Sequence, residues 1–533
     1  MMHEPEEPLR SPIVGDLNAP KHGPAEEIHP PADPEQQVPM LIELNLRYPG
    51  GLLGCREAFY SLWIQRYSDV AGGWWPEEVT LASPVQPPVP HGLALIAPKL
   101  YQCVLSRSVL RDMVETDRVL GADRGWPPTI FRVWPDYQLD PLIDRSASTV
   151  KANAAWRSYD AHGRGVVWAV IDSGIDAHHP HFSHLELAHD AQGMEPPSLT
   201  SRLHRDFSFL VNPDDPETGG PGDPDWKRPF MDDSGHGTHV AGIISGCTPD
   251  DMTPCVADST DPVDGGYVQR AHVGRLSGMA PACELVSLKV MRRSRQGTWI
   301  TSSSAVIRAL TYLRTEVNVD PGLLRVHGVN MSLGSPWSPA QYAAGQSPLC
   351  QAVNQLVSSG VVVVVSAGNF GARTATGDSV NTSAVLGSIT EPAHAEECIA
   401  VGSTHRDAPH AFGVTWTSSK GPTLDGRMKP DVVAPGEWIA SAASGAIRAT
   451  AGLDAAAGGP PASFLTYAEQ SGTSMAAPHV SGVVAAFLSA RPEFIGRPRQ
   501  IKRLLTDTAT DLGRERYAQG AGLVDLMRML GNV

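Results

Sequence analysis

The chain has 533 residues and a formal net charge of −15, because 57 Asp and Glu residues outnumber 42 Lys and Arg residues. This acidic balance argues against binding to nucleic acid, which would require a basic surface. The sequence contains no run of about 18 apolar residues, so it predicts no membrane-spanning helix. The length would accommodate about three domains of average size, and the 51 Gly and 46 Pro residues indicate long surface loops.

The first segment, residues 1–38, is acidic, rich in Pro and without an aromatic residue. It lacks the basic stretch followed by an apolar stretch that forms a standard export signal. We therefore expect a disordered leader and a cytoplasmic protein, although a non-standard export route stays open. The seven cysteines have no repeated spacing. Cys247 and Cys255 could form a disulfide, but reduced thiols are expected in a cytoplasmic protein.

Residues 39–139 alternate between strand and helix patterns, which predicts a small α/β domain. Ser106 or Ser108 is suited to cap its second helix. The predicted elements are a strand over Met40–Leu46, a helix over Arg56–Tyr67, a strand over Leu100–Leu105, a helix over Val109–Arg118 and a strand over Thr129–Trp134.

The next strong strand signal is the apolar run Val166–Ile171, which is typical of a buried parallel strand and leads into Asp172. In open α/β sheets, side chains at the carboxyl ends of strands form the functional sites. Asp172 is therefore a candidate site residue, although a single Asp after a strand is more often a turn former or a helix cap.

A second candidate, His236, follows the turn sequence Asp-Asp-Ser-Gly at residues 232–235. The small and apolar residues after it predict a helix packed closely against the sheet, with His236 in its first turn. His239 lies one turn further on, so a pair of metal ligands is an alternative interpretation. No further Asp, Glu or Cys follows at a ligand spacing, and we therefore expect no metal here.

A third candidate, Ser474, lies at the start of a helix predicted over Met475–Ala490. A hydroxyl at this position is usually only a helix cap. Pro478 is expected in the first turn of this helix, where its missing N–H costs little. On its own, this segment does not identify a nucleophile.

A fourth segment adds an amide to these groups. Val361–Val365 are five consecutive valines, too few to span a bilayer and the right number for a central strand. Asn369 follows at the end of this strand. An amide there could donate a hydrogen bond to a developing oxyanion, with the backbone N–H of Ser474 as a second donor.

Together these segments resemble the subtilisin-like serine peptidases. The resemblance covers about residues 149–526 and includes the Asp, His, Asn and Ser motifs in the family's order. It implies a three-layer α/β domain with a mainly parallel sheet, which we place at residues 140–533. Further signatures of the family are Gly278-Met279-Ala280-Pro281, Asn330-Met331-Ser332-Leu333-Gly334, Ile399-Ala400-Val401-Gly402 and Lys429-Pro430-Asp431-Val432-Val433-Ala434-Pro435-Gly436.

The resemblance implies a serine endopeptidase that hydrolyses extended polypeptides through an acyl-enzyme, without a cofactor. Asp172 would orient His236, which would take the proton of Ser474. Asn369 would stabilise the oxyanion of the tetrahedral intermediate. The tripeptide Ser332, Leu333 and Gly334 would form an exposed strand edge that pairs with the substrate backbone, and its Leu would wall the first specificity pocket.

The small domain that precedes the peptidase domain looks like the family's inhibitory propeptide, which would make it an intramolecular partner. Self-cleavage would then fall near Leu139-Asp140, with the preceding segment lying in the substrate groove like a product. The alternative is a permanently attached domain that helps folding or binds a partner.

Three long loops, residues 183–231, 248–277 and 444–470, are expected to be functional or mobile. The Asp-rich part of the second loop, residues 248–264, invites a calcium hypothesis, but the ligand spacing of an EF-hand is absent. At the calcium site that is common in the family, His181 stands where an Asp is usual. Calcium at that site is therefore not expected.

Two features bear on specificity. Phe370 follows the oxyanion Asn, and Thr390-Glu391-Pro392 stands where many relatives have Gly ahead of the Pro, so the first pocket is expected to be narrowed. We hypothesise that the arginines of segment 292–295 accept an acidic residue before the scissile bond, which Asp136 would supply in self-cleavage. A solvated basic turn is the alternative, and a catalytically silent peptide-binding module is the rival function.

Overall fold

The computed structural model divides the chain into two compact units, residues 1–139 and residues 140–533. This division falls where the sequence predicts the end of the N-terminal domain. Most of the expected leader and the segment around Leu139-Asp140 lie outside the described residues. The structure describes residues 37–67, 89–135, 146–192, 200, 202–211, 227–260, 266–272, 274–294, 296–320, 322–336, 343–375, 381–454, 459–460 and 464–533.

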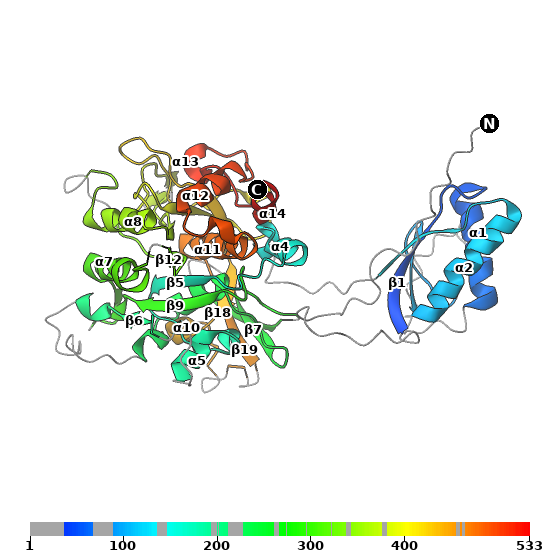
Figure 1. The fold of residues 1–533 in the computed structure, drawn as a ribbon, viewed down its shortest axis with the longest axis horizontal. Coiled ribbons are helices and arrows are strands. Elements are labelled where there is room, and N and C mark those ends of the chain that lie inside the picture. The colour runs from blue at the N-terminus through cyan, green and yellow to red at the C-terminus, as the bar shows by residue number, and fades with distance from the viewer. Residues whose placement is uncertain are drawn as a thin grey trace. The chain divides into compact units, whose positions relative to one another are not determined.

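The N-terminal unit is a four-stranded antiparallel sheet with two helices (Figure 1). The strand order β2-β3-β1-β4 and the chain order βαββαβ correspond to a ferredoxin-like arrangement. Its elements are β1 (Gln37–Leu44), α1 (Gly51–Arg66), β2 (Ala94–Ala97), β3 (Leu100–Ser106), α2 (Arg107–Arg124) and β4 (Ile130–Pro135).

This unit has its own hydrophobic core. Met40, Ile42 and Leu44 are buried because alternate side chains of a strand point to the same face, and they pack with Phe59 and Trp63 of α1. The predicted strands and helices are found to within a few residues at their ends, apart from β2. That strand has only four residues, all apolar, and so gives no alternating pattern.

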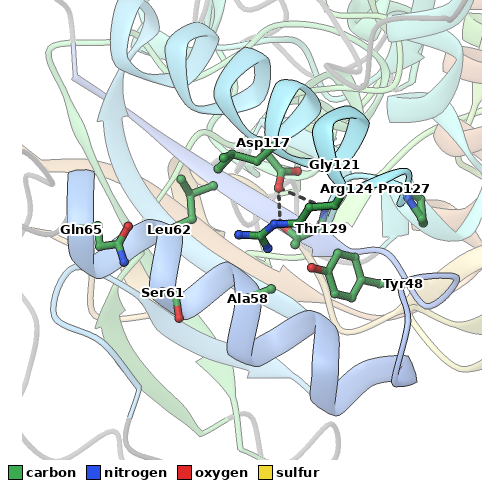
Figure 2. Close-up of a pocket in the computed structure, with 11 residues that line it drawn as sticks. Tyr48, Ala58, Ser61, Leu62, Gln65, Asp117, Gly121, Arg124, Pro127 and Thr129 are labelled. Atoms are coloured by element: carbon green, nitrogen blue, oxygen red, sulfur yellow. Dashed lines mark hydrogen bonds between the residues drawn. The ribbon is translucent and has the colours of Figure 1, made fainter.

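A hollow of about 340 Å³ lies between α1 and α2 (Figure 2). Asp117 of α2, which lines it, accepts hydrogen bonds from Thr129 N (3.1 Å), Thr129 Oγ1 (2.7 Å) and Ile130 N (2.8 Å). Burial raises the pKa of Asp117, and these hydrogen bonds only partly offset it. The carboxylate therefore fixes α2 to the start of β4 and is part of the architecture of this unit.

The second unit contains a seven-stranded, fully parallel sheet in the order β17-β16-β13-β12-β5-β9-β6. Its strands are β5 (Val167–Asp172), β6 (Arg205–Asp206), β9 (Glu284–Lys289), β12 (Gly328–Met331), β13 (Val362–Ser366), β16 (Ile399–His405) and β17 (Val432–Glu437). The order shows that β5, β12 and β13 are neighbours. Residues that follow these three strands therefore leave the same edge of the sheet.

Helices cover both faces of this sheet, because alternate residues of its strands enter two different cores. Val362 and Val364 of β13 pack with α6 (His236–Ile244) and α11 (Thr473–Ala490). Val363 and Val365 pack with α7 (Ser303–Tyr312) and α8 (Pro348–Ser358). The predicted three-layer α/β architecture is therefore confirmed.

Helix α11 is the central helix of the unit. Among the described residues it alone is long and apolar enough to cross a membrane by length and composition. However, 83% of it is buried inside the unit. Its apolar character is therefore explained by its position in the core.

Two of the long segments expected to be loops form a second sheet instead. β7 (Thr253–Ser259) and β8 (Tyr267–Ala271) pair with β19 (Phe464–Gln470) and β18 (Ile439–Ala442) in the order β18-β19-β7-β8. The loop prediction was wrong there, because β7 finds its parallel partner about two hundred residues further along the chain, which local patterns cannot indicate. Cys255 of β7 and Cys247 are both free thiols, so the alternative disulfide is not formed.

The remaining elements are short. Two hairpins consist of β10 (Arg292–Arg293) with β11 (Trp299–Ile300) and β14 (Ala372–Ala375) with β15 (Asn381–Ala384). The other helical segments are α3 (Ser146–Thr149), α4 (Ala152–Tyr159), η1 (Pro180–Phe182), α5 (Glu186–Gln192), η2 (Ser208–Val211), η3 (Arg228–Phe230), η4 (Leu313–Val317), α9 (Pro409–Phe412), α10 (Gly445–Thr450), η6 (Pro492–Phe494), α12 (Pro498–Asp507), α13 (Arg516–Gln519) and α14 (Leu526–Gly531).

Candidate active site

Asp172 is the last residue of β5, and its side chain is fully buried. Its Oδ1 accepts hydrogen bonds from Ser173 N (2.8 Å) and from His236 Nδ1 (2.8 Å). Because a carboxylate can only accept, His236 Nδ1 must carry a proton, which leaves the lone pair of Nε2 free in the neutral ring. The imidazole therefore has the tautomer that a general base requires.

His236 is the first residue of α6, as predicted, and its side chain is 26% exposed. Glycines on either side of it allow α6 to approach the end of β5. A Cβ on Gly237 would lie 2.1 Å from Gly174 O, and a Cβ on Gly235, which has a φ of 83°, would lie 2.0 Å from Ser444 O. A larger residue at either position would displace the helix that carries the imidazole.

A second buried carboxylate, Asp232, holds this arrangement in place. Its Oδ1 accepts hydrogen bonds from Gly235 N (2.9 Å) and Ser173 Oγ (2.9 Å). Its Oδ2 accepts from Thr238 N (2.8 Å) and Thr238 Oγ1 (2.7 Å). Sequence analysis did not find this role, although an Asp shortly before a helix is typical of N-terminal capping.

The pKa of His236 is raised above its ordinary value. Burial by itself would lower this pKa, but the charge and the hydrogen bond of Asp172, together with the charge of Asp232, outweigh it. The protein therefore favours the imidazolium, the form that the ring takes after it has accepted a proton from a hydroxyl.

Ser474 is the second residue of α11, and it exchanges two hydrogen bonds with Ser332, which follows β12. Ser474 Oγ donates to Ser332 O (3.2 Å), and Ser332 Oγ donates to Ser474 O (2.8 Å). Pro478 lies in the second turn of α11, not in the first as predicted, because the helix begins at Thr473. Since Pro478 has no N–H, the carbonyl of Ser474 lacks its usual helical donor, and Ser332 supplies one.

A chain of buried polar side chains supports Ser332. Asn330 Nδ2 donates to Ser332 Oγ (2.9 Å), and Ser481 Oγ of α11 donates to Asn330 Oδ1 (2.9 Å). These contacts explain why the motif at residues 330–334 contains two polar residues inside the core. They join the end of β12 to the helix that carries Ser474.

Asn369 lies beyond the end of β13, and its amide group has a defined orientation. Its Oδ1 accepts hydrogen bonds from Thr473 N (2.9 Å) and Thr473 Oγ1 (3.1 Å). Because a backbone N–H can only donate, the atom facing it must be the amide oxygen. Nδ2 therefore points away from Thr473. Within the described part of the chain it donates no hydrogen bond, so both of its hydrogens are available to a ligand.

The structure brings the predicted site residues to one edge of the sheet. Asp172 is joined to His236, while Ser474 is joined to Ser332 directly and to Asn369 through the neighbouring Thr473. Within the described residues, no hydrogen bond joins Ser474 to His236. The site thus consists of two separate hydrogen-bonded groups, one of Asp172 and His236 and one that contains Ser474 and Asn369.

Thr390, from the segment expected to narrow the first specificity pocket, is buried. Leu333 is buried and Gly334 is exposed, and both extend beyond the end of β12. A Cβ on Gly334 would lie 2.6 Å from Thr390 Oγ1, and a Cβ on Gly368 would lie 2.5 Å from Thr390 Cγ2. Thr390 therefore contacts the segments that follow both β12 and β13, and the narrowing of the pocket stays a prediction.

His239, the alternative metal ligand, and His181, which stands where the family's calcium site usually has an Asp, both have structural partners. His239 Nε2 is hydrogen-bonded to Ala468 O (2.9 Å), and burial lowers the pKa of this ring to about 3. His181 Nδ1 lies 2.9 Å from Tyr467 Oη and its Nε2 lies 3.1 Å from Ser245 O. A buried neutral imidazole with both nitrogens engaged does not fit the oxygen-rich coordination of calcium.

Several charged residues of the loops are paired within the unit. Asp250 forms an ion pair with Arg275 (3.0 Å), and Asp258 forms one with Arg270. Arg292 and Arg293 form strand β10 of a short hairpin. Asp136, Asp261, Asp264 and Arg295 lie outside the described residues.

A buried carboxylate that holds a histidine, together with a serine in the first turn of a helix, is typical of serine hydrolases built on an α/β sheet. Comparison with protein families agrees with this class, because residues 163–523 match the model of the Subtilase family, Peptidase S8. The chain therefore belongs to the subtilase family. It is a serine endopeptidase, a hydrolase of peptide bonds.

Individual relatives cover most of the chain. M-protease of Shouchella clausii (strain KSM-K16) is 30% identical over 403 residues, which cover 73% of this chain and 74% of the relative. Serine protease AprX of Bacillus subtilis (strain 168) is 29% identical over 416 residues, 74% of this chain and 73% of the relative. Subtilisin Savinase of Lederbergia lenta is 30% identical over 378 residues, 71% of this chain and 95% of the relative. The predictions of family and enzyme class are thus confirmed.

Proposed function

We propose that Asp172, His236 and Ser474 form the catalytic triad of this peptidase. Ser474 Oγ attacks the carbonyl carbon of the scissile bond while His236 Nε2 takes its proton, and the Asp172 carboxylate stabilises the resulting imidazolium. His236 then gives this proton to the leaving amine as the C–N bond breaks, which leaves an ester on Ser474. A water molecule then attacks the ester carbon while His236 takes its proton, and His236 returns this proton to Ser474 Oγ as the ester bond breaks and the second product leaves.

The oxyanion of each tetrahedral intermediate is proposed to lie between Asn369 Nδ2 and the backbone N–H of Ser474. Thr473 supports this role. It donates two hydrogen bonds to Asn369 Oδ1, which leaves Nδ2 directed away from Thr473 and free to donate to an oxyanion. The N–H of Ser474 belongs to the first turn of α11, whose amides have no acceptor within the helix. Both donors are in place before the charge develops, which is the condition for effective electrostatic stabilisation.

Ser474 Oγ must leave the carbonyl of Ser332 before it can donate to His236. We expect this change when a substrate backbone aligns with Ser332, Leu333 and Gly334, because catalytic hydrogen bonds often form fully only in the complex. Rotation about one side-chain bond exchanges one staggered position of the hydroxyl for another. Ser332 therefore provides an alternative acceptor for the nucleophile in the free enzyme.

The observation that carries this proposal is the 2.8 Å hydrogen bond between the buried Asp172 and His236 Nδ1. A fluorophosphonate probe followed by peptide mapping tests it. Label is expected on Ser474 in the wild type and in the control Ser471→Ala, an exposed neighbour, but not in Ser474→Ala. Peptide hydrolysis by Ser474→Ala should fall by about 10⁶-fold, the loss known for removal of the nucleophile in subtilisin. A wild type without label would favour a silent peptide-binding module.

We also propose that the N-terminal unit is an inhibitor of the peptidase unit and is removed near Leu139-Asp140. Its separate core and its position directly before the peptidase unit support this role. Intact mass spectrometry of the wild type and Ser474→Ala is the test. Loss of about 139 residues from the wild type alone is expected. An active wild type of full mass would mean a permanently attached domain.

The enzyme is further proposed to act in the cytoplasm and without a cofactor. Seven free thiols suit a reducing compartment, and the net charge of −15 disfavours a nucleic acid partner. The chemistry described above is complete with protein side chains alone. A chelator is therefore expected to leave both activity and melting temperature unchanged, and a loss that calcium restores would contradict this view.

A further inference from the structure

The loop that carries Asn369, residues 368–371, is attached to a second loop, residues 416–420. Backbone groups of the first loop are bonded to the second at three positions, one before Asn369 and two after it. The hydrogen bonds are Ser419 N to Gly368 O (2.9 Å), Phe370 N to Ser419 Oγ (3.0 Å) and Gly371 N to Thr417 O (2.8 Å). The position of Asn369 therefore depends on how these two loops fit together.

Lys420 adds a cation to this contact. Its Nζ donates hydrogen bonds to Gly371 O (3.0 Å), Trp416 O (3.1 Å) and Ser418 O (3.0 Å). An ammonium group has three donors, so all of them are used by main-chain carbonyls. We call these three acceptors the carbonyl cage. Carbonyl oxygens that face one point repel each other unless a cation lies between them, as in potassium sites.

The main chain of Lys420 is fixed independently of its side chain. Lys420 N donates to Ser388 Oγ (2.9 Å), and Ser388 N donates to Lys420 O (2.9 Å). The fit is also tight at Gly371, where a Cβ would lie 1.8 Å from Ser418 O and 2.7 Å from Lys420 Nζ. Removal of the ammonium should therefore release the carbonyl of Gly371 rather than the backbone of Lys420.

We propose that the Lys420 ammonium is a tethered cation that closes the carbonyl cage and so holds Asn369 where it can donate to the oxyanion. Lys420 is a positioning residue, since it acts through Gly371 and not on the substrate. The proposal rests on the oxyanion role of Asn369 given above. It predicts a loss that is confined to the transition state, because ground-state binding of the substrate does not require the oxyanion donor.

The first test compares Lys420→Ala with Lys420→Met. Both variants are expected to lower kcat by about 10- to 100-fold with little change in KM, because a small displacement of a catalytic donor is costly. Lys420→Ala leaves space at the carbonyl cage, so potassium or propylammonium ions should restore part of its kcat. Lys420→Met fills that space with an apolar chain and should not respond. Tetramethylammonium, which cannot donate a hydrogen bond, controls for ionic strength.

Two further variants complete this test. Lys420→Arg keeps the positive charge and is expected to retain kcat within a few-fold. Comparison of its kcat with that of Lys420→Met therefore tests the role of the charge even if Lys420→Ala does not fold. Lys151→Ala is the matched control, because Lys151 is half exposed and pairs with Asp525 away from the carbonyl cage. Its kcat should not change and should not respond to the added cations.

A double-mutant cycle separates positioning from general stabilisation. If Lys420 acts through Asn369, then Lys420→Ala should lower kcat no further in an Asn369→Ala background. Additive losses, equal losses of kcat in the Arg and Met variants, or a loss of kcat that no cation restores would each overturn the inference. Those results would leave the proposed function untouched, because hydrolysis of peptides by the wild type and labelling of its Ser474 test that function separately.

Discussion

The two halves of the active site are built in different ways. In the acid–base half, Asp172 is fully buried and His236 begins a helix whose first turn is bound by a second carboxylate, Asp232. In the nucleophile half, Asn369 is exposed and Ser474 is hydrogen-bonded to Ser332 rather than to His236. The hydrogen bond of the first half is already formed, whereas we propose that the second half is completed only with substrate.

This difference indicates what each half contributes. Groups that set a pKa need a fixed, desolvated environment, which buried strand ends and helix termini provide. Of the groups that we propose to meet the reacting carbonyl, Asn369 lies on a loop and is bonded to Thr473, whereas Ser474 lies in the first turn of α11 and is bonded to Ser332. Changes in the acid–base half should therefore alter pH profiles, and changes in the nucleophile half should alter the rate at every pH.

Among substitutions that compare the two halves, Asp172→Asn is expected to have the largest effect. kcat should fall by about 10⁴-fold, since an amide can hold the imidazole in the wrong tautomer. Because the charge of Asp172 raises the pKa of His236, its loss should also move the acid limb of the kcat/KM profile to lower pH. Steady-state kinetics across the pH range check both effects.

The control for this change is Asp233→Asn, which neutralises an exposed carboxylate next to Asp232. It should leave both the rate and the acid limb in place. An acid limb in Asp172→Asn that stays where it is, or moves to higher pH, would contradict the assigned cause of the pKa shift.

In the nucleophile half, Asn369→Ala should lower kcat by about 10²- to 10³-fold, the range measured for the equivalent donor of subtilisin. Asn369→Asp sharpens the test, since a carboxylate can still accept from Thr473 but cannot donate to an oxyanion. Both variants should keep the acid limb of the wild type. A displaced limb would mean that the two halves are not independent.

Asp232→Asn should have a smaller effect, about tenfold on kcat, because it loosens His236 without removing a reacting group. An amide at this position places a donor against the buried N–H groups of Gly235 or Thr238. The unfolding free energy should fall by about 1–3 kcal/mol, measured by chemical denaturation. Equal unfolding free energies of Asp232→Asn and Asp233→Asn would show that Asp232 does not organise the acid–base half.

The smallest expected change is one of specificity. Thr390→Gly removes the side chain that contacts both Gly334 and Gly368, and so should enlarge the first pocket. The ratio of kcat/KM for Phe over Ala substrates should rise by about tenfold. Matched peptides that differ only before the scissile bond provide the measurement, and an unchanged ratio would mean that Thr390 does not limit the pocket.

Much of the site could be predicted because apolar runs locate strand ends. Val166–Ile171 and Val361–Val365 predict central strands, and Asp172 and Asn369 follow from their positions after them. The helix that begins at His236 could also be predicted, since small residues after a turn sequence indicate a closely packed helix. These features depend only on residues that are neighbours in the sequence, so a single sequence is enough to predict them.

The supporting contacts could not be predicted, because they join residues that are far apart in the chain. Ser332 and Ser474 are separated by 142 positions, and Gly371 and Lys420 by 49. Neither pair has a local pattern that indicates its partner. The role of Asp232 was missed for a different reason, because a capping residue and a residue that organises a catalytic pair look the same in sequence.

The central claim is that His236, oriented by Asp172, activates Ser474. The rate constant for fluorophosphonate labelling of Ser474, measured as a function of pH, tests it most directly. We expect a single ionisation above the usual histidine pKa of about 6.5, and near loss of labelling in His236→Ala. A labelling rate that is independent of pH, or one that His236→Ala leaves unchanged, would contradict it.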